Sequence, residues 1–208
     1  MQIVYILDIK DIASKYEQVL KALPLSAKQK AEEFKEKDDK LRSLGGALLV
    51  EAFTAKSSLF YNEYGKPYKH KPPYFNISHS ENKVGIFLSD SDSVGFDIQY
   101  IKEYNEKLKD YVFSGEEKAG IKDGLGFAVR WAMKEAAAKC VGTGLRSVKT
   151  QTLTNISADN FIFGGEKLYY KNYFDGEYAF TACSPKAVNA EFLQINATFA
   201  LKTLAKKL

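Results

Sequence analysis

A seven-residue segment near the middle of the chain alternates apolar and polar side chains: Val94-Gly95-Phe96-Asp97-Ile98-Gln99-Tyr100. Such alternation predicts a β-strand with one face in the core, because successive side chains point to opposite sides of a sheet. The core face would hold Val94, Phe96, Ile98 and Tyr100. On the other face, Asp97 and Gln99 would converge on one ion, and Gly95 would leave room for a ligand. An ordinary strand with a polar outer face is the alternative.

The pattern further along the chain predicts a strong helix over residues 126–141, ended by Gly142-Thr143-Gly144. Trp131, Glu135 and Lys139 follow each other at intervals of four residues and share one face. The plain interpretation is a surface ion pair between Glu135 and Lys139, worth a few tenths of a kcal/mol. The functional interpretation is that Glu135 ligates a metal while Lys139 faces an anionic substrate. Oxygen ligands from Asp97, Gln99 and Glu135 would favour Mg²⁺ or Mn²⁺ over zinc.

A second polar motif, Asn76-Ile77-Ser78-His79-Ser80, is predicted to end a strand in a turn. A lone histidine is more often a structural hydrogen-bonding residue than a catalyst, but this setting presents donors to a phosphate. Further candidates in the N-terminal half are Lys30, Arg42, Ser43 and Lys66. Each lysine alone is an ordinary surface charge, whereas their collective excess suits an anionic ligand.

Length and composition limit the class of protein. With 208 residues, 45% of them hydrophobic, the chain can build one large domain or two smaller ones. A net charge of +4 suits an anionic partner and falls well short of a nucleic-acid-binding tail. Cys140 and Cys183 are expected to be buried thiols, with a disulfide left open. No signal peptide or membrane span is predicted, so a cytoplasmic protein is expected.

The chain alternates between segments of strand and helix character. Strands are predicted at 2–9, 74–78, 83–89, 94–100, 160–163, 166–171, 177–183 and 190–200. Helices are predicted from a cap at Ser26, over 39–57 and in pieces over 103–123. The turn Ser89–Ser93 is expected to close a hairpin, and the tail from Lys202 to Leu208 to be loosely held. Two α+β halves meeting near residue 100 are inferred, with one continuous α+β domain as the alternative.

Several motifs together resemble the Sfp-type 4'-phosphopantetheinyl transferases. Asn76 to Ser80 resembles the family's N-[IL]-S-H-S motif, and Gly95 to Gln99 its G-[IV]-D-[IVL]-E motif. Trp131 to Lys139 is similar to W-[ST]-x-K-E-[AS]-x-x-K, and Gly142 to Leu145 to the closing G-x-G-L. The segment from Arg42 to Leu48 is similar to the family's R-[ST]-x-x-G-x-[LV] helix. Separate motifs in the right order are a more specific signal than any one of them.

The resemblance implies an α+β fold of two similar α/β subdomains related by a pseudo-twofold, with the site between them. Residues 1–100 would form the coenzyme A phosphate side, and residues 101–208 would carry the metal-binding helix. The implied activity is Mg²⁺-dependent transfer of the 4'-phosphopantetheine arm of coenzyme A to a serine of an apo acyl or peptidyl carrier protein, releasing 3',5'-ADP.

The resemblance also implies a role for each candidate residue. Asp97, Gln99 and Glu135 would bind Mg²⁺, with Glu135 taking the serine proton. Lys139 would contact the pyrophosphate and stabilise the leaving phosphate. The coenzyme A phosphates would be bound by Lys66, Ser78 and His79, with Lys30, Arg42 and Ser43 at the 3'-phosphate.

Gln99 departs from the family's pattern, because the second acidic residue of the strand motif is an amide here. An amide oxygen still ligates Mg²⁺, but the site loses one negative charge. A non-catalytic relative that binds coenzyme A or carrier proteins is therefore an alternative, and a generic nucleotide- or nucleic-acid-binding protein is a more distant one. The carrier protein, the pathway and the tolerance for acylated coenzyme A stay open. A monomer without nucleic-acid or membrane partners is expected.

Overall fold

The computed structural model describes residues 1–91, 93–144 and 146–207. Its elements run in the order β1 (Gln2–Asp8), α1 (Ile9–Ser14), α2 (Tyr16–Ala22), α3 (Leu25–Glu32), α4 (Lys37–Phe53), β2 (Phe60–Tyr61), β3 (Pro67–Tyr68), β4 (Tyr74–Ser80), β5 (Lys83–Ser89), β6 (Gly95–Tyr100), α5 (Glu106–Val112), α6 (Glu116–Ala119), α7 (Gly124–Val141), α8 (Arg146–Thr150), β7 (Asn160–Phe163), β8 (Glu166–Phe174), β9 (Tyr178–Ser184), β10 (Glu191–Ile195) and α9 (Ala197–Ala205). The predicted α+β class is confirmed.

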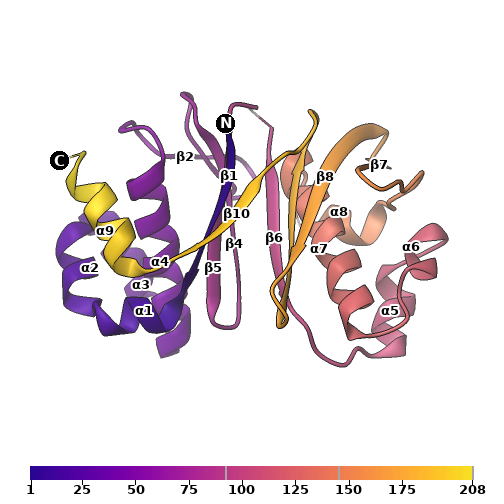
Figure 1. The fold of residues 1–208 in the computed structure, drawn as a ribbon, viewed down its shortest axis with the longest axis horizontal. Coiled ribbons are helices and arrows are strands. Elements are labelled where there is room, and N and C mark those ends of the chain that lie inside the picture. The colour runs from indigo at the N-terminus through magenta and orange to yellow at the C-terminus, as the bar shows by residue number, and fades with distance from the viewer. Residues whose placement is uncertain (92, 145, 208) are drawn as a thin grey trace.

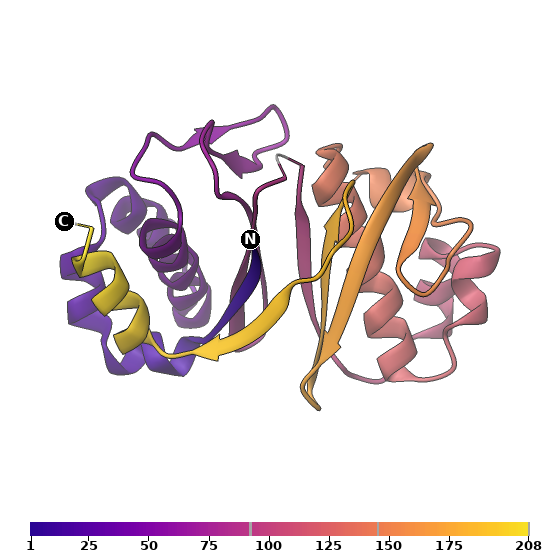
Figure 2. The ribbon, with the colours of Figure 1, turned by 45° about the horizontal axis from the view of Figure 1, so that its top comes forward.

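Two sheets face each other between two layers of helices (Figure 1). Within the described residues, the first sheet has the order β10-β1-β5-β4 and the second the order β6-β9-β8-β7. Helices α1 to α4 and α9 cover the outer face of the first sheet, and α5 to α8 cover that of the second (Figures 1 and 2). No helix of the described residues is both long enough and apolar enough to cross a membrane.

Three apolar clusters hold these layers together. Leu44 and Leu48 of α4 pack on Val84 and Ile86 of the first sheet. Met133 and the alanines of α7 pack among Phe161, Phe163 and Leu168 on the other side. Between the sheets lie Val4, Ile6, Phe87, Phe96, Ile98 and Phe180. The prediction that Phe96 and Ile98 face the core is confirmed, whereas Tyr100 is 38% exposed because it lies at the end of β6.

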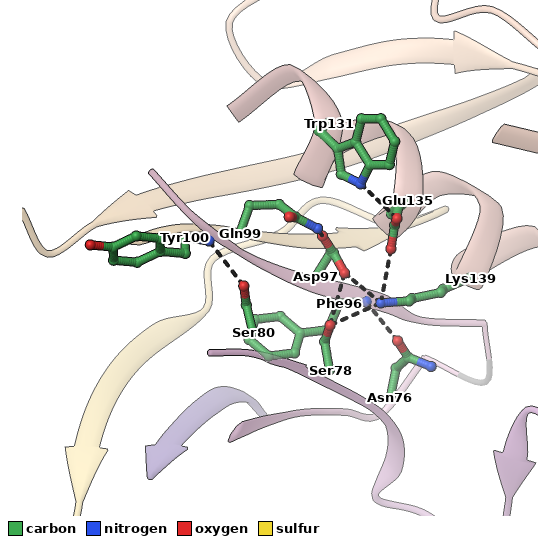
Figure 3. Close-up of polar contacts among 10 residues, drawn as sticks. All are labelled: Asn76, Ser78, Ser80, Phe96, Asp97, Gln99, Tyr100, Trp131, Glu135 and Lys139. Carbon is green, nitrogen blue, oxygen red and sulfur yellow. Dashed lines mark hydrogen bonds and ion pairs between the residues drawn. The ribbon is translucent and has the colours of Figure 1, made fainter. Parts of the chain in front are cut away.

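β4 and β6 end the described strand orders of the two sheets and lie side by side. Side chains of β4, and not its backbone, form hydrogen bonds with the backbone of β6 (Figure 3). Asn76 Oδ1 accepts from the backbone N–H of Phe96 at 2.9 Å, and Ser80 Oγ accepts from that of Tyr100 at 3.1 Å. Because a strand alternates its faces, residues 76, 78 and 80 all point toward β6.

The predicted hairpin over Ser89–Ser93 is wrong. β5 pairs with β4 and β1, while β6 pairs with β9. The apolar face of β6 lies over β5 instead of extending its sheet, since the Phe96 ring packs directly above Gly85. Asp92, within that turn, lies outside the described residues.

Two helix predictions also need correction. α3 begins at Leu25, and Pro24, whose backbone is extended (ψ 156°), is its N-cap, so Ser26 lies within the helix and is not the cap. The segment 190–200 is a strand followed by a helix, because the Asn196 side chain accepts from the N–H of Phe199 and caps α9. The tail predicted to be loose is held by Lys207, whose ammonium donates to the carbonyls of Thr54 and Glu51. Leu208 and Leu145 lie outside the described residues.

The division of the chain at residue 100 stays a prediction. By sheet membership, β6 belongs with the second half although it precedes residue 100. β10 and α9 return to the first half, where β10 pairs parallel with β1 and α9 covers the same face as α4. The C-terminal segment therefore ties the halves together, as Figure 2 shows.

Gly95 does not leave room for a ligand, contrary to the prediction. A Cβ at this position would lie 1.8 Å from the carbonyl oxygen of Ala136 and 2.6 Å from the backbone N of Cys140. The space is filled by the backbone of α7, which capping fixes at both ends. Asp123 Oδ1 accepts from the N–H of Gly126, and Gly142 ends the helix with a φ of 81°.

Gly95→Ala is therefore expected to destabilise the protein by about 3 kcal/mol or more, because a methyl group would push α7 away from β6. Urea denaturation measures the change in the free energy of unfolding. Gly46→Ala is the matched control. Its Cβ would meet nothing closer than 3.8 Å, and alanine favours a helix by about 1 kcal/mol over glycine. Equal stability of the two variants would contradict the close packing of α7 on β6.

Candidate active site

Two carboxylates and one ammonium meet where α7 crosses β6 (Figure 3). Lys139 Nζ lies 2.5 Å from Asp97 Oδ1 and 3.6 Å from Glu135 Oε2. The side chain of Asp97 is 1% exposed, that of Glu135 16% and that of Lys139 23%. These three candidate residues thus lie together, although the lysine lies between the carboxylates.

Asp97 has further donors around it. Ser78 Oγ donates to Asp97 Oδ1 at 2.8 Å, and Gln99 Nε2 donates to Asp97 Oδ2 at 2.8 Å. Lys139 Nζ also donates to Ser78 Oγ at 2.9 Å. Gln99 therefore presents its nitrogen, and not its oxygen, to the place where a metal was predicted.

Glu135 is oriented by a residue to which the sequence assigned no role. Trp131 Nε1 donates to Glu135 Oε1 at 2.6 Å, one helical turn away. The indole is fixed by Phe127, with ring centroids 5.8 Å apart, and by Phe113 at 6.2 Å. The spacing of four residues was the available signal.

Burial and the neighbouring charges alter the acidity of these groups. Burial, followed by the charge of Asp97, raises the pKa of Glu135 to about 7. Burial acts to lower the pKa of Lys139, but the carboxylates of Asp97 and Glu135 outweigh it and raise that pKa. Lys139 thus stays charged while Glu135 titrates near neutral pH.

A second group of predicted residues lines a groove beside the carboxylates. Lys30, Arg42 and Ser43 line a cavity of 540 Å³. Asp97, Glu135 and Lys139 line a neighbouring cavity of 500 Å³. The two share Pro67, Ile77, Ser78 and His79. His79 has an accessible surface within the groove, but the groove walls shield its ring from bulk solvent, and this desolvation together with the charges of Arg42 and Lys139 lowers its pKa.

The cations of this groove differ in how far they are committed to the protein. Arg42 donates to the carbonyl of Glu81 at 2.7 Å and pairs with Asp39 at 2.5 Å. Lys30 is exposed, with its ammonium 5.3 Å from the ring centre of Tyr61. Lys30 is thus the more accessible cation at this end of the groove.

Lys66 is held more firmly. Its ammonium donates to the carbonyls of Val94 at 2.9 Å and Lys139 at 2.6 Å, and burial lowers its pKa. These contacts fix the end of α7. A direct phosphate contact by Lys66, as predicted, would have to compete with them.

The oxygen donors of this site match the ligands that Mg²⁺ prefers in proteins. That ion commonly takes one or two carboxylates together with water and phosphate oxygens. Among the described residues, no group of three or more His, Cys, Asp or Glu side chains converges on one point, and Asp97 and Glu135 are the acidic pair. The raised pKa of Glu135 marks a place where a second positive charge would be favourable. These residues therefore fit a two-carboxylate site for a divalent cation.

A buried ion pair supports the far side of α7 and was also not foreseen. Lys134 Nζ lies 3.0 Å from Glu117 Oε1 and donates to the carbonyl of Val112 at 2.7 Å. Glu117 in turn accepts from the N–H of Leu153 at 3.0 Å. The pair connects α7 to α5, α6 and the segment after α8, so that the helix carrying Glu135 is fixed from both sides.

Comparison with known proteins shows which family the chain resembles. Residues 93–185, which include Asp97, Glu135 and Lys139, match the model of the 4'-phosphopantetheinyl transferase superfamily. A 4'-phosphopantetheinyl transferase of Bacillus subtilis is 27% identical over 194 residues, covering 83% of this chain and 86% of its own. Over these residues the chain resembles the 4'-phosphopantetheinyl transferase superfamily.

Two further relatives match more locally. The 4'-phosphopantetheinyl transferase gsp of Aneurinibacillus migulanus is 34% identical over 51% of each chain. The 4'-phosphopantetheinyl transferase AcpT of Salmonella typhi is 33% identical over 46% of this chain and 55% of its own. The chain thus spans about half the length of these two relatives. The predicted resemblance to this family is confirmed, and the matches support a transferase enzyme.

The titration of Glu135 in this transferase predicts how stability depends on pH. Its folded pKa, about 7, lies above the ordinary 4.5, so the folded protein holds a proton that the unfolded chain releases between these values. That contribution to stability is complete below the lower value and is lost as pH rises through the higher one. Between about pH 5 and about pH 8, the free energy of unfolding should fall by about 2 to 3 kcal/mol more in the wild type than in Glu135→Gln.

Urea denaturation at both pH values gives this difference. Glu63→Gln, which changes an exposed glutamate, is the control and should follow the wild type. Parallel pH curves for the wild type and Glu135→Gln would contradict the raised pKa.

Proposed function

We propose that this transferase moves the 4'-phosphopantetheine arm of coenzyme A to a serine of an apo acyl or peptidyl carrier protein and releases 3',5'-ADP. The observation that carries the proposal is the groove, in which a cationic wall and a carboxylate pair are joined through Ser78 and His79. Coenzyme A has a 3'-phosphate at one end of its nucleotide and a pyrophosphate at the other. A groove with these two regions suits both groups.

The cationic end would bind the 3'-phosphate. Arg42 and Lys30 supply charge there, and Ser43 and His79 supply hydrogen-bonding groups. The guanidinium of Arg42 is partly neutralised by Asp39, so the phosphate would compete with that carboxylate for the arginine. Lys66 would assist from the end of α7. Ser78, which lines both cavities, would lie between the two phosphate regions.

The carboxylate end would hold the reacting groups. Asp97 and Glu135 would hold a divalent cation, and Gln99 would add its amide oxygen once the amide turns away from Asp97. The ion would supply positive charge to the pyrophosphate as its P–O bond breaks. The serine oxygen would form a bond to the phosphorus of the phosphopantetheine group, and 3',5'-ADP would leave with the bridging oxygen. Glu135, directly or through water, would take the serine proton. Lys139 would stabilise the charge on the leaving phosphate.

The finer parts of the fold and setting are proposed with this activity. Each half combines a sheet with helices on its outer face, once β6 is counted with the second half and β10 and α9 with the first, which supports a pseudo-twofold relation between them. The basic chain, with pI near 8.8, suits acidic carrier proteins. Because one chain carries both sides of the groove, a monomer is proposed. A cytoplasmic location is proposed as well.

A second function is favoured by one observation. Gln99 is neutral and donates to Asp97, so the site has one carboxylate fewer than the family's motif. A relative that binds coenzyme A or a carrier protein without transferring the arm would tolerate this loss.

Intact-mass spectrometry of an apo acyl carrier protein, incubated with this protein, coenzyme A and Mg²⁺, separates the two functions. Transfer adds one phosphopantetheine to the carrier and should be lost with EDTA. Glu135→Gln should reduce the rate by about a hundredfold or more, the usual contribution of a positioned acid or base. Near-normal turnover in that variant would refute the role of Glu135. Coenzyme A binding without transfer to any carrier would favour the binding protein, and restored transfer in Gln99→Glu would then assign the defect to Gln99.

Arg42→Gln tests the 3'-phosphate end separately. If Arg42 contacts this group, the variant should raise the KM for coenzyme A by about tenfold, as expected for a lost charge-assisted hydrogen bond. The KM for dephospho-coenzyme A, which lacks the 3'-phosphate, should change little. Lys71→Gln, which removes an exposed cation outside the groove, is the control. An equal change for both substrates would show that Arg42 does not contact the 3'-phosphate.

A further inference from the structure

The hydrogen bonds around Asp97 indicate how the site is kept closed in the free protein. Asp97 accepts from Ser78, Gln99 and Lys139, and it is 1% exposed. The ammonium of Lys139 therefore lies where a cation bound to Asp97 and Glu135 would have to lie. A metal ion cannot reach both carboxylates while Lys139 stays there.

We propose that Lys139 is a built-in cation that blocks the metal site until an anionic ligand draws it away. This inference rests on the proposed function, because the anionic ligand is the pyrophosphate of coenzyme A. In the free protein Lys139 compensates the two buried carboxylates. When phosphate oxygens arrive, Lys139 exchanges its carboxylate partners for them, and the divalent cation takes its place. Lys139 thus couples the binding of the metal to that of coenzyme A, in addition to its proposed role at the leaving phosphate.

The physical reason is charge compensation at a buried site. Two carboxylates that lose water need a positive charge beside them, and removing it leaves them uncompensated. Moving Lys139 away without another cation in its place is therefore unfavourable. Placing a divalent cation beside the Lys139 ammonium is also unfavourable while no phosphate compensates that ammonium. The exchange becomes favourable when both happen in one complex. The coupling must then be reciprocal, since each ligand raises the affinity for the other by the same factor.

The backbone around Lys139 limits this exchange to its side chain. The Lys139 carbonyl accepts from the ammonium of Lys66 at 2.6 Å, and that ammonium also donates to Val94. The next residue, Cys140, lies against Gly95. The end of α7 is thus pinned to β6 from both sides. Lys139 can turn from the carboxylates toward the groove while the helix stays fixed.

Gln99 strengthens the closed state. Its amide donates to Asp97 Oδ2, which orients the other oxygen, Oδ1, toward Lys139. A glutamate at this position would repel Asp97 instead of donating to it. The neutral side chain therefore favours the arrangement in which a single ammonium compensates the carboxylates.

Mn²⁺ binding to the full chain tests the inference without any turnover. It is measured as the loss of the free-ion signal in electron paramagnetic resonance. The wild type should bind Mn²⁺ weakly alone and at least about tenfold more tightly with saturating coenzyme A. Lys139→Met should bind Mn²⁺ about tenfold more tightly than the wild type in the absence of coenzyme A, and its enhancement by coenzyme A should fall by the same factor. Lys149→Met removes one exposed lysine outside both cavities and should behave as the wild type.

A charge-balanced pair keeps the test valid if Lys139→Met does not fold. In Glu135→Gln the site has one carboxylate, and adding Lys139→Met should again raise the affinity for Mn²⁺ by about tenfold. The inference is overturned if removal of Lys139 leaves Mn²⁺ affinity at the level of the Lys149→Met control. It is also overturned if the wild type binds Mn²⁺ equally well with and without coenzyme A.

The same samples separate this inference from the function on which it rests. Metal-dependent transfer by the wild type, together with unchanged Mn²⁺ affinity in Lys139→Met, would refute the blocking lysine and leave the transferase intact. Absence of both transfer and Mn²⁺ binding in the presence of coenzyme A would refute the proposed function itself.

Discussion

The candidate site depends on the way in which two sheet edges meet. The backbone groups of an edge strand need partners, and β4 supplies them to β6 with side chains in place of a ladder. Asn76 and Ser80 make these bonds from one face of β4. Ser78, two residues from each, lies on the same face and points into the same seam. The space between the strands is therefore polar although apolar layers surround it. This polar seam allows Asp97 to remain buried, because donors meet its carboxylate there.

A second constraint sets the distance between the strand and the helix. Gly95 lets the backbone of α7 approach β6 so closely that a single methyl group would collide with Ala136. At this separation Lys139 can reach Asp97 while Glu135, one turn earlier, points to the same ammonium. The capped ends of α7 and the buried pair of Lys134 and Glu117 hold the helix in that position. The glycine thus serves packing, and the ligand space lies on the other side of the carboxylates.

The elements with clear periodicity were predictable from the sequence, and their pairing was not. The alternation of residues 94–100 and the pattern of residues 126–141 predicted β6 and α7 nearly to their ends. The alternation did not say which sheet β6 joins, because an apolar face is buried equally well beside β5 or on top of it. Bonds such as that from the Phe96 N–H to the Asn76 side chain join segments twenty residues apart and leave no periodic signal. Asn196 was missed because an apolar run surrounds it, yet one capping residue suffices to turn the second part of that run into α9.

The charges of the site explain why a neutral Gln99 is compatible with this arrangement. In the free protein, Lys139 faces the carboxylate of Asp97 and that of Glu135, whose pKa of about 7 leaves it partly protonated near neutral pH. One ammonium therefore nearly balances the pair, and a third carboxylate would leave the buried site with excess negative charge. A divalent cation that replaces the ammonium brings one charge more than it displaces. The phosphates of a bound ligand must then compensate both this additional charge and the displaced ammonium. Because Gln99 supplies no negative charge of its own, the site depends more strongly on its substrate.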